Sequence, residues 1–211
     1  PALHAFFQAA LQLLAGPAEP SLLTLVLQKL RHYVPFLVPF PKFARKLLKL
    51  LLHAWADGAR TGDARTLAQL QTVALLRVRQ LALAQPYPFV ELCLRGAYLA
   101  YVRNAKFVNE QSEPRVDLMR RCVAELCALD LDATYQHAFV SIRQLALHLR
   151  NAMVHNTKGA KDTLQHVYSW QFVNCLKLWA AALQAPAARN QQRAQDRAAP
   201  AHRSAIPTGR A

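Results

Sequence analysis

Metal or acid–base chemistry would be expected first at the histidines and aspartates of the sequence. His137 and His148 share one predicted helix, but eleven positions separate them, roughly 16 Å along the axis. A shared zinc ion would need a nitrogen of each within about 2 Å. Asp130 and Asp132 match the spacing of a metal-binding pair, yet they stand where a helix cap is needed. The sequence therefore predicts no metal site and no catalytic residues, with an uncatalogued hydrolase or transferase left open as an alternative.

The cysteines and glycines argue against zinc fingers and nucleotide sites. The four cysteines form no CxxC pair, and no histidine stands at finger spacing from them. Cys122 and Cys127 are five positions apart, which places them on different faces of a helix. We therefore expect buried, reduced thiols. The six glycines are isolated, so neither GxGxxG nor a Walker-type phosphate loop can be written, and no cofactor is predicted.

A basic stripe runs along the third predicted helix, residues 42–56, opposite a leucine-rich apolar face. A cationic stripe without interleaved acids has two interpretations, which stay open here: a solvated helix face, or a contact with RNA or an acidic partner. The stripe consists of Lys42, Arg45, Lys46 and Lys49.

The seventh predicted helix is electropositive along its whole length. Residues 133–155 hold no Asp or Glu, whereas Arg143 and Arg150 stand two turns apart, roughly 10 Å. One side carries an apolar stripe of Tyr135, Phe139, Ile142, Ala146 and Leu149, and another a polar stripe of His137, Ser141, Gln144, His148 and Asn151. The polar stripe suggests contact with another surface. Alternatively, its members hydrogen-bond to neighbouring turns inside a packed fold.

Aromatic residues gather in the fifth and eighth predicted helices, residues 89–102 and 161–183. Trp170 and Phe172 are two positions apart and face different directions, so at least one is committed to helix packing. We expect core aromatics rather than a stacking platform for bases at Tyr98, Tyr101, Tyr168, Trp170, Phe172 and Trp179.

Proline, glycine and small acidic clusters divide the chain into eight segments with helical spacing of apolar residues. Ser21 and Asp132 are candidate helix caps, and no strand is predicted. Helices of this length joined by short turns favour an all-α fold of antiparallel hairpins, a HEAT/armadillo-like α-solenoid, over residues 1–185. Residues 186–211 are predicted to form a disordered basic tail, rich in Ala, Arg and Pro. The predicted helices span residues 2–15, 21–34, 42–56, 64–84, 89–102, 115–128, 133–153 and 161–183.

Composition supports a folded basic protein. The 211 residues carry a formal net charge of +14 with a pI near 10.2, which disfavours acidic or neutral cytosolic enzymes. Hydrophobic residues make up 53%, enough for a sizeable core. No run of eighteen apolar residues occurs, so we expect a soluble intracellular protein and no membrane contact. A sequence that begins at Pro1 rather than Met fits an internal piece of a longer chain.

Four motifs in order carry a family resemblance. They are Tyr101-Val-Arg-Asn104 followed by Lys106-Phe107; Tyr135-Gln-His-Ala-Phe139; residues 142–151, from Ile142 to Asn151; and Tyr168-Ser-Trp-Gln-Phe172 with Leu178-Trp179. With these motifs, residues 21–183 resemble the nucleolar complex protein 2 family of large-subunit ribosome biogenesis factors.

The resemblance implies a non-enzymatic helical scaffold of the nucleus and nucleolus, also found in the nucleoplasm. By resemblance, its partners are nucleolar complex proteins 1 and 3 and the pre-ribosomal large-subunit particle, with possible contact to pre-rRNA and no small-molecule substrate. A direct RNA-binding module and a chromatin-associated corepressor-type adaptor are the alternatives. The residues expected to contact a partner or RNA are Arg103, Lys106, Tyr135, Gln136, His137, Arg143, Arg150 and Asn151.

Overall fold

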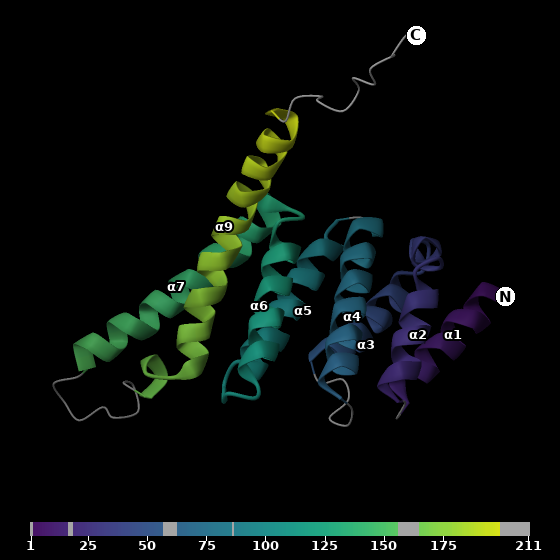
Figure 1. Cartoon of the computed structure of the whole chain (residues 1–211), viewed down its shortest axis with the longest axis horizontal. Helices are drawn as coiled ribbons and strands as arrows, with labels where there is room; N and C mark the ends of the chain where they lie inside the picture. Colours follow the sequence, from purple (N-terminus) through teal and green to yellow (C-terminus); the bar gives the residue numbers. More distant parts are fainter. Residues whose placement is uncertain (1, 17–18, 57–62, 86, 156–164, 199–211) are drawn as a thin grey trace, which may run out of the picture.

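The computed structural model describes residues 2–16, 19–56, 63–85, 87–155 and 165–198. Within these ranges all the regular elements are helical, which confirms the predicted all-α class. Figure 1 labels the α-helices, and a short 3₁₀ helix, η1 (Val34–Leu37), follows α2. The α-helices are α1 (Ala2–Ala15), α2 (Pro20–Leu30), α3 (Pro41–Ala56), α4 (Ala64–Ala84), α5 (Phe89–Asn104), α6 (Glu113–Cys127), α7 (Leu131–His155) and α9 (Trp170–Ala198).

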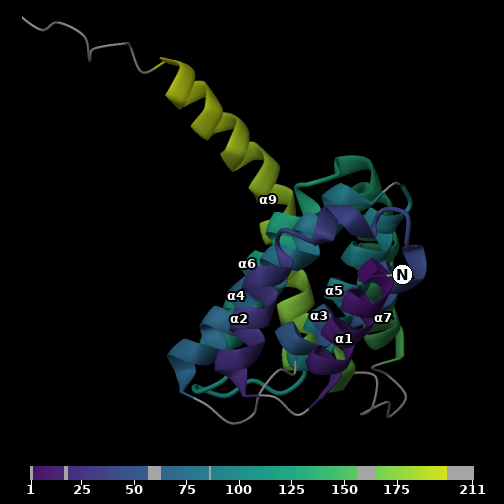
Figure 2. The ribbon, with the colours of Figure 1, turned by 90° about the vertical axis from the view of Figure 1, so that its right-hand side faces the viewer.

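The helices form two layers along the long axis of the molecule. In one layer α1 packs on α3, α3 on α5 and α5 on α7, while in the other α2 packs on α4, α4 on α6 and α6 on α9. Across the layers, α1 contacts α2, α3 contacts α4, and α5 contacts both α4 and α6. Figure 2, turned by 90°, separates the α2–α4–α6 layer from the layer of α1, α3, α5 and α7. The pairs α1–α2, α3–α4 and α5–α6 therefore pack as hairpins, and α7 and α9 stand at one end.

Two helices have the predicted bounds at both ends, α1 and α4. The second predicted helix was wrong at its end, because α2 stops at Leu30 and the chain turns into η1. Pro35 explains this, since proline lacks the N–H that an α-helix needs and restricts the residue before it. Ser21 does not cap α2, because Pro20 already begins the helix.

The last helix also differs from its predicted end at Leu183. α9 continues to Ala198, so residues 186–198 of the predicted basic tail are helical. Alanine, glutamine and arginine dominate this stretch and have high helix propensity, which outweighs the single Pro186. Residues 199–211 of that tail lie outside the described residues.

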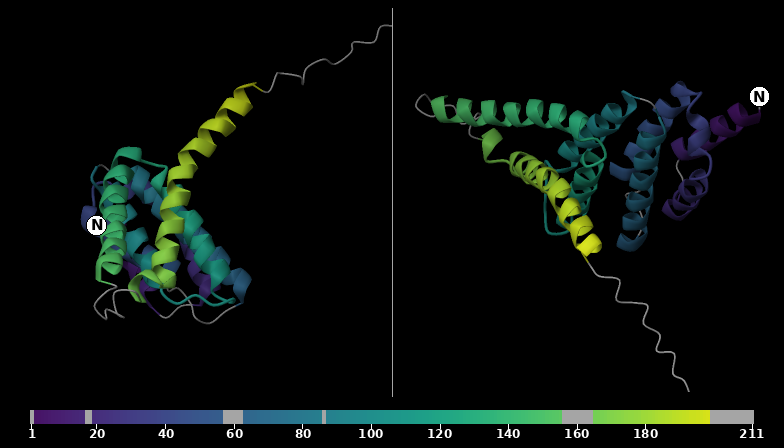
Figure 3. Two further views of the ribbon diagram at one scale, coloured as in Figure 1. Left: turned by 90° about the vertical axis from the view of Figure 1, so that its left-hand side faces the viewer. Right: turned by 90° about the horizontal axis from the view of Figure 1, so that it is seen from above.

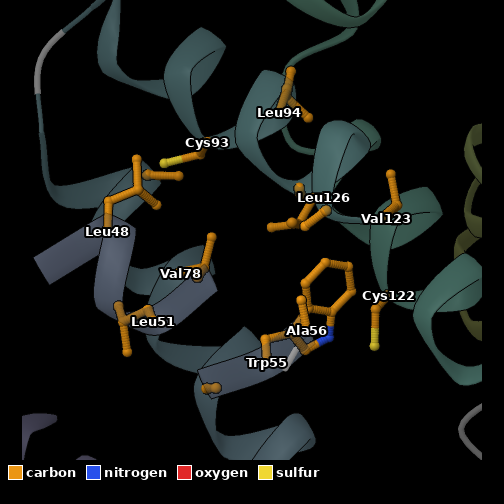
Figure 4. Packing of buried hydrophobic residues seen from close by; sticks show 14 of the residues in the cluster. Leu48, Leu51, Trp55, Ala56, Val78, Cys93, Leu94, Cys122, Val123 and Leu126 are labelled. Atoms are coloured by element: carbon orange, nitrogen blue, oxygen red, sulfur yellow. The ribbon is translucent and has the colours of Figure 1, made fainter. Parts of the chain in front are cut away.

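One continuous core connects the layers. Figure 4 shows side chains of α3, α4, α5 and α6 pointing into a shared interior around Trp55 and Leu126, each 1% exposed. All four cysteines are buried and free, as predicted. Burial raises the pKa of Cys93 to about 12 and that of Cys122 and Cys127 to about 11.

Gly96 lies at a close contact between α5 and α3. A Cβ built at this position would overlap Cδ1 of Leu52, so the two helices pack closely because residue 96 has no side chain. Among the described helices, none combines the length and hydropathy that crossing a bilayer requires.

Candidate interaction surface on α7 and α9

The start of α7 is fixed on the end of α6 by side chains that bond to the backbone. Oδ1 of Asp130 accepts hydrogen bonds from the backbone amides of Asp132 (3.1 Å) and Ala133 (3.0 Å). The predicted cap Asp132 is therefore corrected to Asp130, which precedes the first helical residue. The hydroxyl of Thr134 donates to the carbonyl of Cys127 at 2.7 Å. These bonds set the direction in which α7 leaves the core.

The side of α7 that packs on the core is narrow and made mostly of small residues. Its buried members are Ala133, Thr134, Ala138, Leu145 and Ala152. The larger apolar side chains of the helix therefore lie elsewhere on its surface.

The apolar stripe of α7 faces outward. Tyr135 is 70% exposed and Phe139 56%, and their rings stack with centroids 6.3 Å apart. Ile142 and Leu149 continue the exposed stripe toward the C-terminal half of the helix. A contiguous row of exposed apolar groups is typical of a binding surface, whereas single exposed apolar residues are ordinary.

The polar stripe lies on the opposite flank, and three of its five members line a groove. The groove has a volume of about 670 Å³ and is bounded by α5, α7, α9 and the segments that precede α6 and α9. Ser141, Gln144 and His148 of the polar stripe contribute to it, beside the buried Leu145. None of its described lining residues is acidic. Figure 3 shows α9 beginning near the C-terminal end of α7 and running away from α7 toward its own C-terminal end.

The structure divides most of the predicted contact residues between these two surfaces, while Arg103 of α5 belongs to neither. By helical register Arg143 and Arg150, both exposed, lie beside the apolar stripe, whereas His137 and Asn151 belong to the polar stripe. Lys106 lines the groove, with its Nζ 5.1 Å from the centre of the Phe107 ring. Exposed side chains are also found at Arg103, Tyr135, Gln136 and Asn151, while His137 is half-buried.

Three exposed aromatic residues were not predicted as surface groups. Tyr168 is 84% exposed and Trp170 is 55% exposed, so the expectation of core aromatics was wrong for both. Tyr168 precedes α9 and Trp170 begins it, where few helix contacts can cover a ring. Phe107 is 79% exposed in the loop after α5. Tyr101 and Trp179, in contrast, are buried as predicted.

The basic stripe on α3 is exposed at every member, Lys42, Arg45, Lys46 and Lys49. Its three lysines line a second groove, between α1 and α3, while Arg45 is absent from that lining. Across the described part of the chain, no three His, Cys, Asp or Glu side chains come together as a metal site.

Comparison with known proteins adds independent information. Residues 88–200 match the model of the Noc2p family. Nucleolar complex protein 2 of Drosophila melanogaster is 38% identical over 189 residues, which are 90% of this chain and 23% of that protein. Nucleolar complex-associated protein 2 of Arabidopsis thaliana is 37% identical over 184 residues, 87% of this chain and 23% of the relative. The chain thus spans about a quarter of the length of these curated relatives.

Proposed function

This chain belongs to the Noc2p family, and we propose that it is a non-enzymatic helical scaffold in the assembly of the large ribosomal subunit. The names of its relatives place the family in the nucleolus. Its proposed partners are nucleolar complex proteins 1 and 3 and the pre-ribosomal particle.

The exposed apolar stripe of α7 is the observation that carries this proposal. From Tyr135 to Leu149 the stripe runs roughly 21 Å along one side of the helix. Aromatic residues and arginines are the groups that most often anchor protein–protein interfaces, and here Tyr135 and Phe139 stand beside Arg143 and Arg150. Such a surface fits the binding of another protein.

The two-layer packing of hairpins supports an α-solenoid of the HEAT/armadillo kind. In such a fold each hairpin contacts its neighbours, and the outer faces of successive helices form extended binding surfaces. We propose that residues 1–185 form one such helical-repeat domain, as a part of a larger family domain.

A direct RNA-binding module is the second candidate, favoured by the groove between α7 and α9. Lys106, His148 and His166 line it without any acidic neighbour in the lining. Phe107 is exposed and lines the groove, and the exposed Tyr168 is a sequence neighbour of lining residues just before α9. Exposed rings beside cations can stack on bases.

Affinity purification of the tagged chain from cells, with and without nuclease, separates the two candidates. Nucleolar assembly factors that stay bound after nuclease treatment would support the scaffold. Their loss on nuclease treatment would favour RNA binding, and recovery of none of them would contradict the proposed role.

A further inference from the structure

The basic stripe of α3 forms one wall of a groove whose other wall is α1. The groove has a volume of about 640 Å³. Helix α1 contributes one helical face to it, and α3 contributes its lysines with two apolar residues. The lining residues are His4, Gln8, Leu11, Gln12 and Ala15 from α1, and Lys42, Phe43, Lys46, Lys49 and Leu50 from α3.

The charge of the groove has one sign. Neither α1 nor α3 contains any Asp or Glu, so the three lysines have no acidic neighbour on either wall. Lys42, Lys46 and Lys49 stand at i, i+4 and i+7, which places them in one row roughly 10 Å long. The row presents three ammonium groups to whatever lies in the groove.

The floor is apolar and firmly packed. Leu11, Phe43 and Leu50 are half-buried and face the hollow. The His4 ring meets the Phe43 ring edge-on with centroids 4.7 Å apart, and Phe43 also packs on the buried Phe7 at 6.3 Å. Both rings are therefore engaged with protein neighbours rather than available for stacking on bases.

We propose that the α1–α3 groove binds an amphipathic helix of a partner protein, with acidic residues along one side. Apolar side chains of that helix would cover Leu11 and Leu50, and carboxylates at i, i+4 and i+7 would face Lys42, Lys46 and Lys49. The lining runs over residues 4–15 of α1, roughly 16 Å, which suits about three turns of helix. Single-stranded RNA fits less well, because four of the ten lining residues are apolar and the lining presents no unengaged ring.

The first test measures binding of designed helical peptides to the full chain by fluorescence anisotropy at low salt. The acidic peptide carries glutamates at i, i+4 and i+7 and leucines on the neighbouring stripe, and a second peptide has glutamines in place of the glutamates. We expect the acidic peptide to bind roughly tenfold more tightly than the glutamine peptide. Equal binding of the two peptides would overturn the proposal.

Variants of the chain locate the binding site. Reversing the charge of the lysine row (Lys42→Glu, Lys46→Glu and Lys49→Glu) should weaken the acidic peptide about tenfold. The matched control changes three exposed arginines outside the lining of this groove, Arg45→Glu, Arg79→Glu and Arg95→Glu, with the same change in net charge. An equal loss in this control would mean that net charge alone attracts the peptide, which contradicts a specific groove.

A further variant separates a peptide in the groove from RNA on its rim. Gln8→Trp, at an exposed position of α1, should fill the hollow and abolish peptide binding without unfolding the chain. Poly-uridine is the comparison probe. The proposal fails if the acidic peptide does not bind and poly-uridine does, with an affinity that the lysine variant loses and Gln8→Trp keeps. That outcome would show that the lysine row is an RNA-binding surface. The α7 stripe plays no part in these assays, so their outcome is independent of the proposed scaffold function.

Discussion

The hydroxyl of Tyr101 donates a hydrogen bond of 3.0 Å to the carbonyl oxygen of Asn174, 73 positions later in the chain. Two side chains of α9 bond back to the C-terminal end of α5: Nδ2 of Asn174 donates to the carbonyl of Ala105 at 3.4 Å, and Nε2 of Gln171 to that of Val102 at 3.2 Å. The last carbonyls of a helix have no partner within it, so α9 supplies partners that α5 lacks. Residues from two of the motifs that carry the family resemblance thus meet as a structural clamp.

Removing the Tyr101 hydroxyl tests this clamp. Tyr101 is fully buried, so Tyr101→Phe keeps the ring and loses one buried hydrogen bond, which should lower the free energy of unfolding by about 1–2 kcal/mol. Urea denaturation measures this quantity. Tyr87→Phe is the matched control, because the Tyr87 hydroxyl bonds to Glu91 at an exposed site and its loss should cost less than about 0.5 kcal/mol. Equal effects of the two substitutions would show that the clamp adds nothing.

The buried thiols predict a loss of stability at alkaline pH. A free thiol in the unfolded chain has a pKa of about 8.5. Burial raises the pKa of Cys122 and Cys127 to about 11, so below pH 8.5 both states keep the proton and these groups contribute no pH dependence. Between about pH 8.5 and 11 the unfolded chain loses protons that the folded chain retains, and stability falls as pH rises. Each thiol should contribute a slope of about 1.4 kcal/mol per pH unit in that window.

Denaturation by urea at pH 7.5, 9 and 10 checks this slope. A variant with Cys122→Ala and Cys127→Ala has a different baseline stability but should show a shallower fall with pH than the wild type. A slope that is identical in the two proteins would assign the alkaline loss to other groups. In the folded chain at pH 8 all four cysteines should also resist alkylation by iodoacetamide until urea is added, because all are buried.

The close contact at Gly96 predicts that a branched side chain will separate α5 from α3. Gly96→Val places methyl groups where Cδ1 of Leu52 lies, and overpacking of this kind should cost about 1–3 kcal/mol. Thermal unfolding measures the loss. In the combined variant with Leu52→Ala the valine has room, so the double variant should lose less than the sum of the two single variants. If the losses of stability are additive, the cost of Gly96→Val comes from the backbone of α5 rather than from the contact with Leu52.

Local sequence patterns were sufficient for the helices but not for their mutual orientation. Helical spacing with proline and glycine signals gave α1 and α4 at both ends. The same spacing could not tell which side of α7 is buried, because the buried side holds small residues such as Ala138 and Ala152 while Phe139 and Ile142 face outward. The burial of an alanine row depends on how closely α5 approaches, and that distance is not encoded in the periodicity of α7 itself.

The candidate contact residues show the same limit. Arg143, Arg150 and Tyr135 were predicted from the sequence to contact a partner or RNA, and all three side chains are exposed. The division into two surfaces was not predicted, because the groove requires α5 and α9, and these helices meet α7 through contacts between distant parts of the sequence. Likewise, α1 has no charged residue, so nothing in its sequence pointed to its role as a wall of the lysine groove.

The two arginines beside the apolar stripe predict a loss of partner binding without a loss of fold. Arg143→Ala combined with Arg150→Ala removes two exposed cations, so the free energy of unfolding should change by less than about 0.5 kcal/mol. If the surface anchors a partner, the amount of nuclease-resistant partner recovered in affinity purification should fall roughly tenfold. Arg79→Ala with Arg95→Ala, on α4 and α5, is the matched control and should leave recovery unchanged. Full recovery by a folded Arg143/Arg150 variant would exclude these arginines from the interface.

The apolar stripe predicts a larger loss of partner binding from a substitution at Phe139 than from the two arginine substitutions. The Phe139 ring is 56% exposed and touches the Tyr135 ring, so Phe139→Asp should cost about 1 kcal/mol of stability or less while placing a charge in the centre of the proposed interface. A desolvated, unpaired carboxylate in an apolar interface is costly, which should reduce partner recovery below detection. Leu83→Asp on α4, where the leucine is 63% exposed, controls for the general effect of an added surface charge. If partner recovery falls in neither variant, the partner binds elsewhere. If it falls equally in both, the loss reflects the added charge rather than the apolar stripe. Only a selective loss in Phe139→Asp assigns binding to this side of α7.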